Sequence, residues 1–358
     1  MKLQLDGTKI GYHHNRVNSW LIGAKITPIT VDMALTTACN YKCVYCYGKL
    51  QENKQPKREN EWNNYARFLK DAKDIGVKAI SLVSDGESTC SPYVYDFINL
   101  AKNLGLDIAL GTNGLELEYI NIQVLRALTY LRFNISAGEK ERYKEIHGCK
   151  NSDYFTVIKN IRRIVSYKRS SNLKTTIGLQ MVFMPEFKDQ IKPLVKLGKD
   201  LGVDYLVIKH CSDNEVSDLK VSYCDYKSLD IIKELEWAEK QSTDTYQVIV
   251  KWSKINAGKE RTYDHCYGPN FILQISGTGL VAPCGMLFND KYKKYHIGNI
   301  HEQSFKEIVF SEKYDEVMRL LAEEHNVHTM CGTLCLQHNV NEYLDSLKKI
   351  APEHINFI

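Results

Sequence analysis

Short apolar runs alternate with amphipathic stretches along most of this 358-residue chain. Six of the runs have the length and continuous apolar character of buried parallel strands. They are Val31–Thr36, Ala79–Val83, Leu106–Gly111, Leu131–Ile135, Thr176–Val182 and Tyr205–Lys209. The stretches with helical spacing are Trp62–Ile75, Tyr93–Leu104, Tyr154–Tyr167 and Lys188–Leu201. This order predicts an α/β fold, in which six βα units form a partial (β/α)6 barrel of parallel strands.

Glycines mark the ends of the predicted helices. Gly76, Gly105 and Gly202 each follow an amphipathic stretch, where a helix often ends on a residue with positive φ. Barrels of this kind place their chemistry at the carboxyl ends of the strands. We therefore expect the functional side chains in the segments that directly follow the apolar runs.

The strand–helix alternation ends near residue 215. The next residues are mainly polar and predict helices, with a late strand at Gln247–Trp252. Beyond Arg261, Phe271–Ile275 and Leu280–Ala282 flank a glycine-containing turn and predict a hairpin, followed by one helix over Phe305–Ala322. We divide the chain into an N-terminal extension (1–30), the barrel (31–215), a helical connection (216–260) and a small C-terminal α+β domain (261–358).

Charge and hydropathy argue against several classes of partner. The net charge of +4 is too small, and too evenly mixed, for a nucleic-acid-binding surface. No stretch is apolar over the length that spans a bilayer, and the N-terminus lacks the apolar core of a signal peptide. The sequence therefore predicts a cytoplasmic protein without a nucleic-acid or membrane partner, and it gives no indication of oligomeric state.

Eleven cysteines are unusually many for such a chain, and seven of them form two sets. Cys39, Cys43 and Cys46 have the spacing CxxxCxxC and begin three residues after Thr36. The second set is Cys266, Cys284, Cys331 and Cys335. This clustering favours metal or cluster ligation over disulfides. A zinc site and an iron–sulfur cube both take four ligands, so three thiolates leave one position for a histidine or a small molecule.

The CxxxCxxC loop, with Tyr45 before its last cysteine, resembles that of the radical S-adenosylmethionine superfamily. The resemblance implies that Cys39, Cys43 and Cys46 hold a 4Fe-4S cluster. The amine and carboxylate of S-adenosylmethionine would chelate the fourth iron. Reductive cleavage of this cofactor would give a 5′-deoxyadenosyl radical that abstracts a hydrogen atom from substrate. The alternative interpretation of the loop is a structural zinc site.

Segments after the later strands resemble the cofactor-binding motifs of this superfamily. Ser84-Asp85-Gly86-Glu87-Ser88 stands where relatives show Gly-Gly-Glu-Pro, from which Asp85 and Ser88 depart. Gly86 allows close backbone approach, and Glu87 could accept a hydrogen bond from the cofactor ammonium. The alternatives are a solvated acidic turn and, at Asn113, an ordinary Asn-Gly turn. The remaining cofactor contacts implied by the resemblance are Tyr45, Ser84, Asn113, Asn134, Ser136, Gln180 and Val182.

Polar residues alternate along the fourth apolar run. Arg132, Asn134 and Ser136 share one face by the period of a strand, which predicts a polar cavity. The Ile146-His147-Gly148 segment recurs in relatives, and no chemistry is assigned to it.

The four C-terminal cysteines flank the predicted hairpin and helix. Four thiolates suit either an all-cysteine zinc site or a fully ligated cluster. Together with the first set, Cys266, Gly279 and Cys284 resemble the SPASM/twitch extension of radical S-adenosylmethionine enzymes. The resemblance implies one auxiliary 4Fe-4S cluster bound by Cys266, Cys284, Cys331 and Cys335.

Several reactions are compatible with this reading. The preferred one is oxidation of a small polar substrate, such as a sugar or aminocyclitol, with the auxiliary cluster as electron acceptor. His210, Lys209 and Glu186 are candidate bases at strand ends. Alternatives are epimerisation with Cys90 or Cys211 as hydrogen-atom donor, peptide modification, and a non-enzymatic electron carrier or zinc-binding protein. The resemblance also implies a flavodoxin- or ferredoxin-type electron donor.

Overall fold

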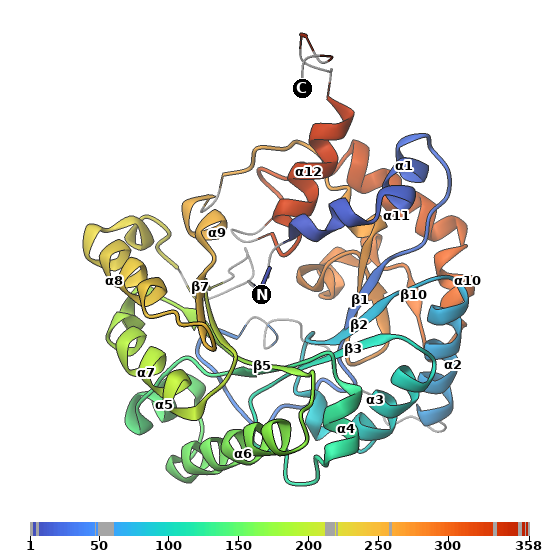
Figure 1. The fold of residues 1–358 in the computed structure, drawn as a ribbon. Helices are drawn as coiled ribbons and strands as arrows, with labels where there is room; N and C mark the ends of the chain where they lie inside the picture. Colours follow the sequence, from blue (N-terminus) through green and yellow to red (C-terminus); the bar gives the residue numbers. More distant parts are fainter. Residues whose placement is uncertain are drawn as a thin grey trace.

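The strands of the protein form one curved sheet with helices on its outer side (Figure 1). The computed structural model describes residues 3–4, 7–46, 48, 61–211, 219, 221–257, 260–331, 335–349, 353–354 and 356. Within these residues the sheet has ten strands in the order β10-β9-β8-β1-β2-β3-β4-β5-β6-β7. The strands from β8 through β1 to β7 pair in parallel, whereas β8–β9 and β9–β10 pair antiparallel.

The six predicted strands are confirmed with small shifts of their ends. The strands are β1 Thr30–Met33, β2 Ala79–Leu82, β3 Asp107–Thr112, β4 Tyr130–Asn134, β5 Thr176–Phe183, β6 Tyr205–His210, β7 Gln247–Val250, β8 Ile272–Ile275, β9 Leu280–Ala282 and β10 Gly298–Asn299. The predicted late strand is β7, which extends the sheet beyond β6. An open parallel α/β barrel with a C-terminal α+β segment is therefore the observed fold.

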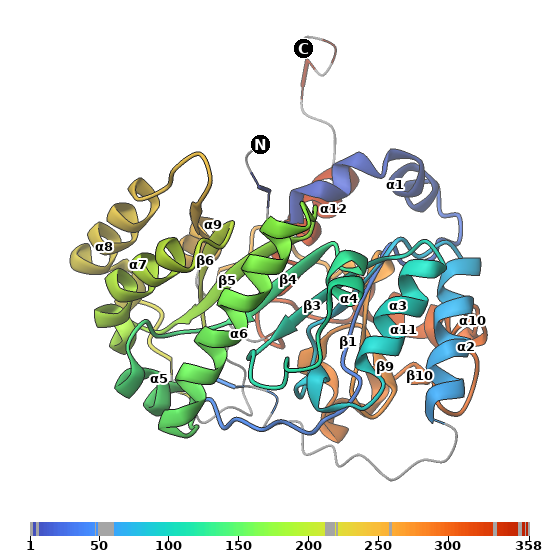
Figure 2. The same cartoon turned by 60° about the horizontal axis from the view of Figure 1, so that its bottom comes forward.

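The helices cover the outer side of the barrel sheet, as Figures 1 and 2 show for α2, α3, α4 and α6. The helices are α1 His14–Leu21, α2 Glu61–Asp74, α3 Val94–Asn103, α4 Ile122–Ala127, α5 Lys140–His147, α6 Asn151–Ser170, α7 Ile191–Leu201, α8 Leu229–Lys240, α9 Trp252–Ala257, α10 Phe305–Val309, α11 Glu312–Glu323 and α12 His338–Lys348. The predicted connection at 216–260 holds α8, β7 and α9, and its residues 216–218, 220 and 258–259 lie outside the described part.

Helical spacing determines which side chains reach the core. On α2, Tyr65, Phe68, Leu69 and Ala72 are all buried against the sheet. These residues repeat at three- and four-residue intervals, so they share one face of the helix. Burial of one such large side chain contributes on the order of 1.5–3 kcal/mol to folding.

One predicted helix is wrong in its continuity. The stretch 305–322 forms two helices, α10 and α11, instead of one. The break lies at Phe310 and Ser311, where the Ser311 hydroxyl accepts a hydrogen bond from the Tyr314 amide and caps α11. Serine followed by the acidic Glu312 is the signal for a new helix start that the hydrophobic spacing obscured.

The C-terminal hairpin is part of the barrel sheet. Strand β8 pairs in parallel with β1 over Thr30–Met33, so Asp32 has Gln274 beside it. The hairpin turn is fixed to the loop after β2, where Asp85 accepts hydrogen bonds from Ser276 Oγ at 2.6 Å and the Gly277 amide at 2.8 Å. A domain boundary near residue 261 remains a prediction, but the sheet continues across it.

Candidate active site

The first cysteine set lies in the loop that follows β1. Cys39, Cys43 and Cys46 line a cavity of about 180 Å³. Lining residues also come from the segments after β2 and β3, from β4, β5 and β6, and from the end of α5. Parallel strands end at the same edge of a sheet, which explains why segments so far apart in the sequence meet at this site.

Eight of the nine predicted cofactor contacts line this cavity. They are Tyr45, Ser84, Gly86, Glu87, Asn113, Asn134, Gln180 and Val182. The exception is Ser136, which is fully buried. Its hydroxyl accepts a hydrogen bond from the Val182 amide at 3.1 Å. Strand β4 ends at Asn134. The strand alternation that predicted a cavity-facing Ser136 therefore does not extend to this residue.

Glu87 and Gly86 both serve the packing of the loops around the cavity. The Glu87 carboxylate accepts hydrogen bonds from Thr89 Oγ1 at 2.8 Å and from the Asn113 amide at 2.7 Å. It thereby joins the segments after β2 and β3, and burial raises its pKa. Gly86 has a φ of 78°, and a Cβ there would collide with the Thr36 carbonyl oxygen. Only glycine lets the loop after β2 approach the loop after β1 so closely.

His147 lies directly against the cysteine loop. Its Nε2 accepts a hydrogen bond from the Ser136 amide at 3.0 Å, so in the neutral ring Nδ1 carries the proton. Nδ1 lies 3.3 Å from Cys43 Sγ and 3.4 Å from the Tyr45 hydroxyl. Burial lowers the pKa of His147 to about 3, which keeps the ring neutral. The sequence analysis assigned this residue no chemistry, and no spacing rule would have placed it beside Cys43.

The carboxyl end of α5 carries both His147 and the anchors of the cysteine loop. The Lys42 amide donates to the His147 carbonyl at 3.1 Å, and the Val44 amide donates to the Ile146 carbonyl at 2.9 Å. The last carbonyls of a helix have no partner within the helix. Here two of them hold the loop that bears Cys43.

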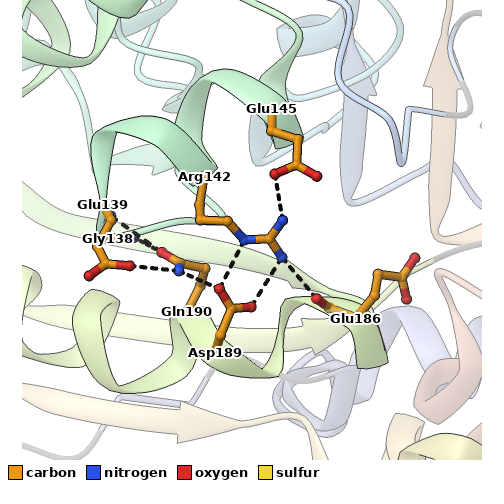
Figure 3. A network of polar contacts seen from close by, with 7 residues as sticks. All are labelled: Gly138, Glu139, Arg142, Glu145, Glu186, Asp189 and Gln190. Atoms are coloured by element: carbon orange, nitrogen blue, oxygen red, sulfur yellow. Dashed lines mark hydrogen bonds and ion pairs between the residues drawn. The ribbon is translucent and has the colours of Figure 1, made fainter.

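The other end of α5 is held by the polar network in Figure 3. Arg142 donates from Nε to Asp189 Oδ2 at 2.9 Å and from Nη2 to Asp189 Oδ1 at 3.1 Å. Its Nη2 also donates to the Glu186 carbonyl at 2.9 Å. The Gln190 side chain accepts from the Gly138 amide at 3.1 Å. These contacts fix α5 to the 3-10 helix Pro185–Gln190 that follows β5.

The candidate bases differ in where β6 places them. Lys209 lines the cavity. His210 faces the other side of the strand, because successive side chains alternate. It is 1% exposed, its Nδ1 lies 2.7 Å from the Cys211 carbonyl oxygen, and burial lowers its pKa to about 4. Glu186 is exposed outside the cavity, with its carbonyl bound by Arg142.

Neither candidate hydrogen-atom donor lines the cavity among the described residues. Cys211 is fully buried, and its amide donates to the Phe183 carbonyl at 2.9 Å. Cys90 ends the short turn that Glu87 begins, and burial followed by the Glu87 charge raises its pKa. The Cys211 thiol is therefore enclosed by protein, whereas Cys90 is half-buried.

Asp32 is a charged residue of the barrel interior that the sequence analysis missed. It lies on β1 between Ser81 of β2 and Gln274 of β8. Burial raises its pKa to about 6, and the charges of Arg132 and Lys209 act in the opposite direction. An acidic residue in an otherwise apolar run, Val31-Asp32-Met33, is the signal that could have identified it.

The second cysteine set lines its own cavity. Cys266, Cys284, Cys331 and Cys335 come together there from three separate segments. Asn341 Nδ2 lies 3.8 Å from Cys266 Sγ and 3.6 Å from Cys335 Sγ, and His325 Nε2 lies 3.2 Å from Cys331 Sγ. Electrostatic interactions link this site to the barrel interior, because Asp32 acts on Cys284 and Lys254 interacts with both Cys335 and Lys209.

The donor sets fit iron–sulfur clusters. Burial and the neighbouring cysteines raise the pKa of Cys284 and of Cys331 to about 12. The same causes raise the pKa of Cys266 well above its usual value. A bound cationic centre would relieve this repulsion between thiolates. Within the described residues no three His, Cys, Asp or Glu side chains converge on a single metal ion. The fit rests on four thiols around one cavity and on three thiols beside a polar cavity with room for a further ligand.

Sequence profiles identify both halves of this arrangement. The Radical SAM superfamily profile matches residues 33–198. The profile of SPASM, an iron–sulfur cluster-binding domain, matches residues 266–335 and so spans the second cysteine set. The chain therefore belongs to the radical S-adenosylmethionine superfamily, with a C-terminal SPASM domain. It is an enzyme whose cofactors are S-adenosylmethionine and iron–sulfur clusters, which confirms the resemblance.

Relatives of this chain carry out different reactions. It is 24% identical over 339 residues to AdoMet-dependent heme synthase of Methanosarcina barkeri, covering 87% of this chain and 90% of the relative. It is 22% identical over 288 residues to S-adenosylmethionine-dependent nucleotide dehydratase of Flammeovirga pacifica, covering 78% and 88%. The crystal structure of Streptococcus suis SuiB bound to S-adenosylmethionine shares the fold, with a TM-score of 0.66, 14% identity and coverage of 99% and 82%.

The described residues include no helix that is long and apolar enough to cross a membrane.

Proposed function

We propose that this enzyme abstracts a hydrogen atom from a small polar substrate and oxidises it. One observation carries the proposal. The three thiols of the CxxxCxxC loop and eight predicted cofactor contacts line one polar cavity, into which Arg132 and Lys209 also project. A substrate group bound in this cavity would lie beside the cofactor, as radical transfer requires.

The two cysteine sets would hold the clusters. Cys39, Cys43 and Cys46 would bind the first cluster, and Cys266, Cys284, Cys331 and Cys335 the auxiliary one. When bound, the clusters and S-adenosylmethionine would supply the 5′-deoxyadenosyl radical and an acceptor for the electron that substrate oxidation releases.

Residues of the cavity wall would orient the cofactor. Glu87 already accepts from Thr89 and Asn113, and its carboxylate oxygens retain lone pairs for an ammonium donor. Gln180 Nε2 donates to Asn134 Oδ1 at 3.0 Å. The side-chain atoms Asn134 Nδ2 and Gln180 Oε1 would then bind ribose or carboxylate groups. Tyr45, whose ring contacts His147, would close the cavity behind the cysteine loop.

We propose Asp32 as the proton acceptor. Oxidation of a carbon radical to a carbonyl or alkene releases one proton, which needs a base in the barrel. With its pKa raised to about 6, Asp32 is mostly ionised at neutral pH yet more basic than an ordinary aspartate. Asp32 also interacts electrostatically with Cys284, one of the four cysteines of the auxiliary site. His210 and Glu186 are poorer candidates, because His210 is buried beside the Cys211 carbonyl oxygen and Glu186 is exposed.

Epimerisation fits this site less well, whereas peptide modification is a second candidate. Epimerisation would need a thiol in the cavity wall, and Cys90 and Cys211 do not line it among the described residues. Peptide modification is supported by the similarity to the PqqA peptide cyclase of Methylobacterium nodulans, which is 25% identical over 185 residues.

We further propose that the enzyme acts in the cytoplasm with a flavodoxin- or ferredoxin-type electron donor.

An anaerobic assay with product analysis tests the proposal. Reconstituted enzyme is given S-adenosylmethionine, reductant and a panel of small polar metabolites and peptides. We expect one 5′-deoxyadenosine for each product that has lost two hydrogens. The Asp32→Asn variant should still form 5′-deoxyadenosine but at least about tenfold less product, whereas the exposed Asp244→Asn control should match the wild type. A product of unchanged mass, or a modified peptide, would overturn the proposal.

A further inference from the structure

The cavity holds two cationic side chains that pair with no carboxylate among the residues that the structure describes. Arg132 and Lys209 both line it. Neither forms a hydrogen bond or an ion pair within the described part of the chain, and Arg132 Nε is buried there without a partner. A buried guanidinium nitrogen left unpaired is costly, and in native structures such a group requires an explanation.

The sheet makes room for the Arg132 side chain. On β4, Arg132 stands beside Gly111 of β3 and Gly178 of β5. A Cβ at Gly111 would lie 3.4 Å from Arg132 Nη2, so the missing side chain there leaves space for the guanidinium. Gly178 accommodates the Tyr205 ring, with which a Cβ would collide.

The nearby acidic residues form no ion pair with the two cations within the described residues. Glu87 lines the cavity, and its carboxylate accepts hydrogen bonds from Thr89 and Asn113. Asp32 interacts electrostatically with both cations, yet it forms no ion pair with either among the described residues. Lys251 and Lys254 add further positive charge around Lys209. The cavity therefore presents a net positive potential to an entering molecule.

We propose that Arg132 and Lys209 bind an anionic group of the substrate, a carboxylate or a phosphate. Arginine presents a planar fork of donors that matches two oxygens of such a group, and the lysine adds a point charge. Arg132 lies two residues before Asn134 on β4, so it is about 7 Å further from the cysteine end of the strand. The anion would anchor the substrate between the first cysteine set and Asp32. This inference names the substrate class for the proposed function and rests on it.

Binding of small anions tests the inference. Reconstituted protein with saturating S-adenosylmethionine is titrated calorimetrically with inorganic phosphate and with malonate. We expect one anion to bind per chain, and the tighter of the two identifies the group as phosphate or carboxylate. Arg132→Met and Lys209→Met should each weaken binding about tenfold or more. The exposed controls Arg126→Met and Lys199→Met should leave it unchanged.

Three outcomes would overturn the inference. The first is that no anion binds, and the second is that the control variants lose as much anion affinity as Arg132→Met and Lys209→Met. The third is that the anion competes with S-adenosylmethionine and that Arg132→Met binds the cofactor more weakly. The last outcome would assign the cations to the cofactor carboxylate. If Arg132→Met does not fold, Arg132→Lys replaces it, since it keeps the charge but loses the fork. Formation of 5′-deoxyadenosine, measured on the same samples, tests the proposed function separately.

Discussion

His147 has only one arrangement of its ring proton that satisfies its surroundings. The Ser136 amide occupies Nε2, so Nδ1–H points to Cys43 and Tyr45. A donor to a ligand sulfur stabilises the more negative, reduced form of an iron–sulfur cluster. With Cys43 as a ligand, as proposed, His147 would be a positioning residue that acts through Cys43 on the electron affinity of the first cluster.

Replacing His147 should lower the reduction potential of the first cluster. His147→Phe removes the Nδ1 donor, so the reduced cluster loses a stabilising contact. A redox titration followed by electron paramagnetic resonance measures this shift, with the SPASM cluster of the same sample as internal reference. His147→Gln keeps an N–H donor and should restore part of the shift, while the exposed His14→Phe should change nothing. An unchanged potential in His147→Phe would contradict the assigned tautomer.

Lys209 gives the anion site a defined pH dependence. Burial, and then the charge of Arg132, lower its pKa to about 7, with Lys251, Lys254 and Asp32 as the other charged neighbours. The lysine is cationic below this pKa and neutral above it. Malonate affinity should therefore fall as pH rises through about 7. The fall should be absent in Lys209→Met, and a flat profile in the wild type would contradict the assignment.

At the level of elements, Asp85 explains a departure from the Gly-Gly-Glu-Pro pattern. Its carboxylate ties the loop after β2 to the turn between β8 and β9. A glycine at this position could not make these contacts. The substitution that weakened the resemblance in the sequence therefore fastens the C-terminal hairpin to the barrel.

Removal of the Asp85 side chain should destabilise the protein. Asp85→Ala leaves Ser276 Oγ and the Gly277 amide without their buried acceptor. We expect a loss of about 2–4 kcal/mol in the free energy of unfolding, measured by denaturant titration. Asp74→Ala, at an exposed position of α2, is the control and should stay within about 0.5 kcal/mol of the wild type. A similarly small effect for Asp85→Ala would show that the hairpin is held by other contacts.

The network of Figure 3 should contribute less, because it lies near the surface. Arg142→Met removes the paired bonds to Asp189 and the bond to the Glu186 carbonyl. We expect about 1–2 kcal/mol of destabilisation by thermal unfolding, since exposed ion pairs are weak but paired arginine contacts are stronger. Arg126→Met on α4 serves as the exposed control. A loss no larger than that of the control would mean that α5 is held by its other contacts.

Helices and strands were predicted correctly where the hydrophobic residues of a segment follow a single pattern, either a continuous apolar run or helical spacing. The continuous apolar runs gave all six barrel strands, and helical spacing gave α2, α3, α6 and α7. It was wrong at Ser311, where a cap interrupts a continuous apolar pattern. It also missed the pairing of β8 with β1, because no local signal tells which strand a distant segment will join.

For the whole molecule, motif spacing predicted the two cysteine sets and most of the cavity wall. The orientation of side chains after a strand ends was beyond it, as Ser136 shows. The His147 contact and the interaction of Asp32 with Cys284 were likewise hidden, because they depend on how separate segments pack. The electrostatics that distinguish a substrate class emerged only in three dimensions.

The central claim is that three thiols of one loop hold the cluster that activates S-adenosylmethionine. The most direct measurement is 5′-deoxyadenosine formation by anaerobically reconstituted protein with reductant, alongside its iron and sulfide content. The account predicts about eight irons per chain and 5′-deoxyadenosine in the wild type and in Cys224→Ala, an exposed cysteine outside both sets. Cys39→Ala, Cys43→Ala and Cys46→Ala should each abolish the product. Formation of 5′-deoxyadenosine by these three variants, or none by the wild type, would contradict the account.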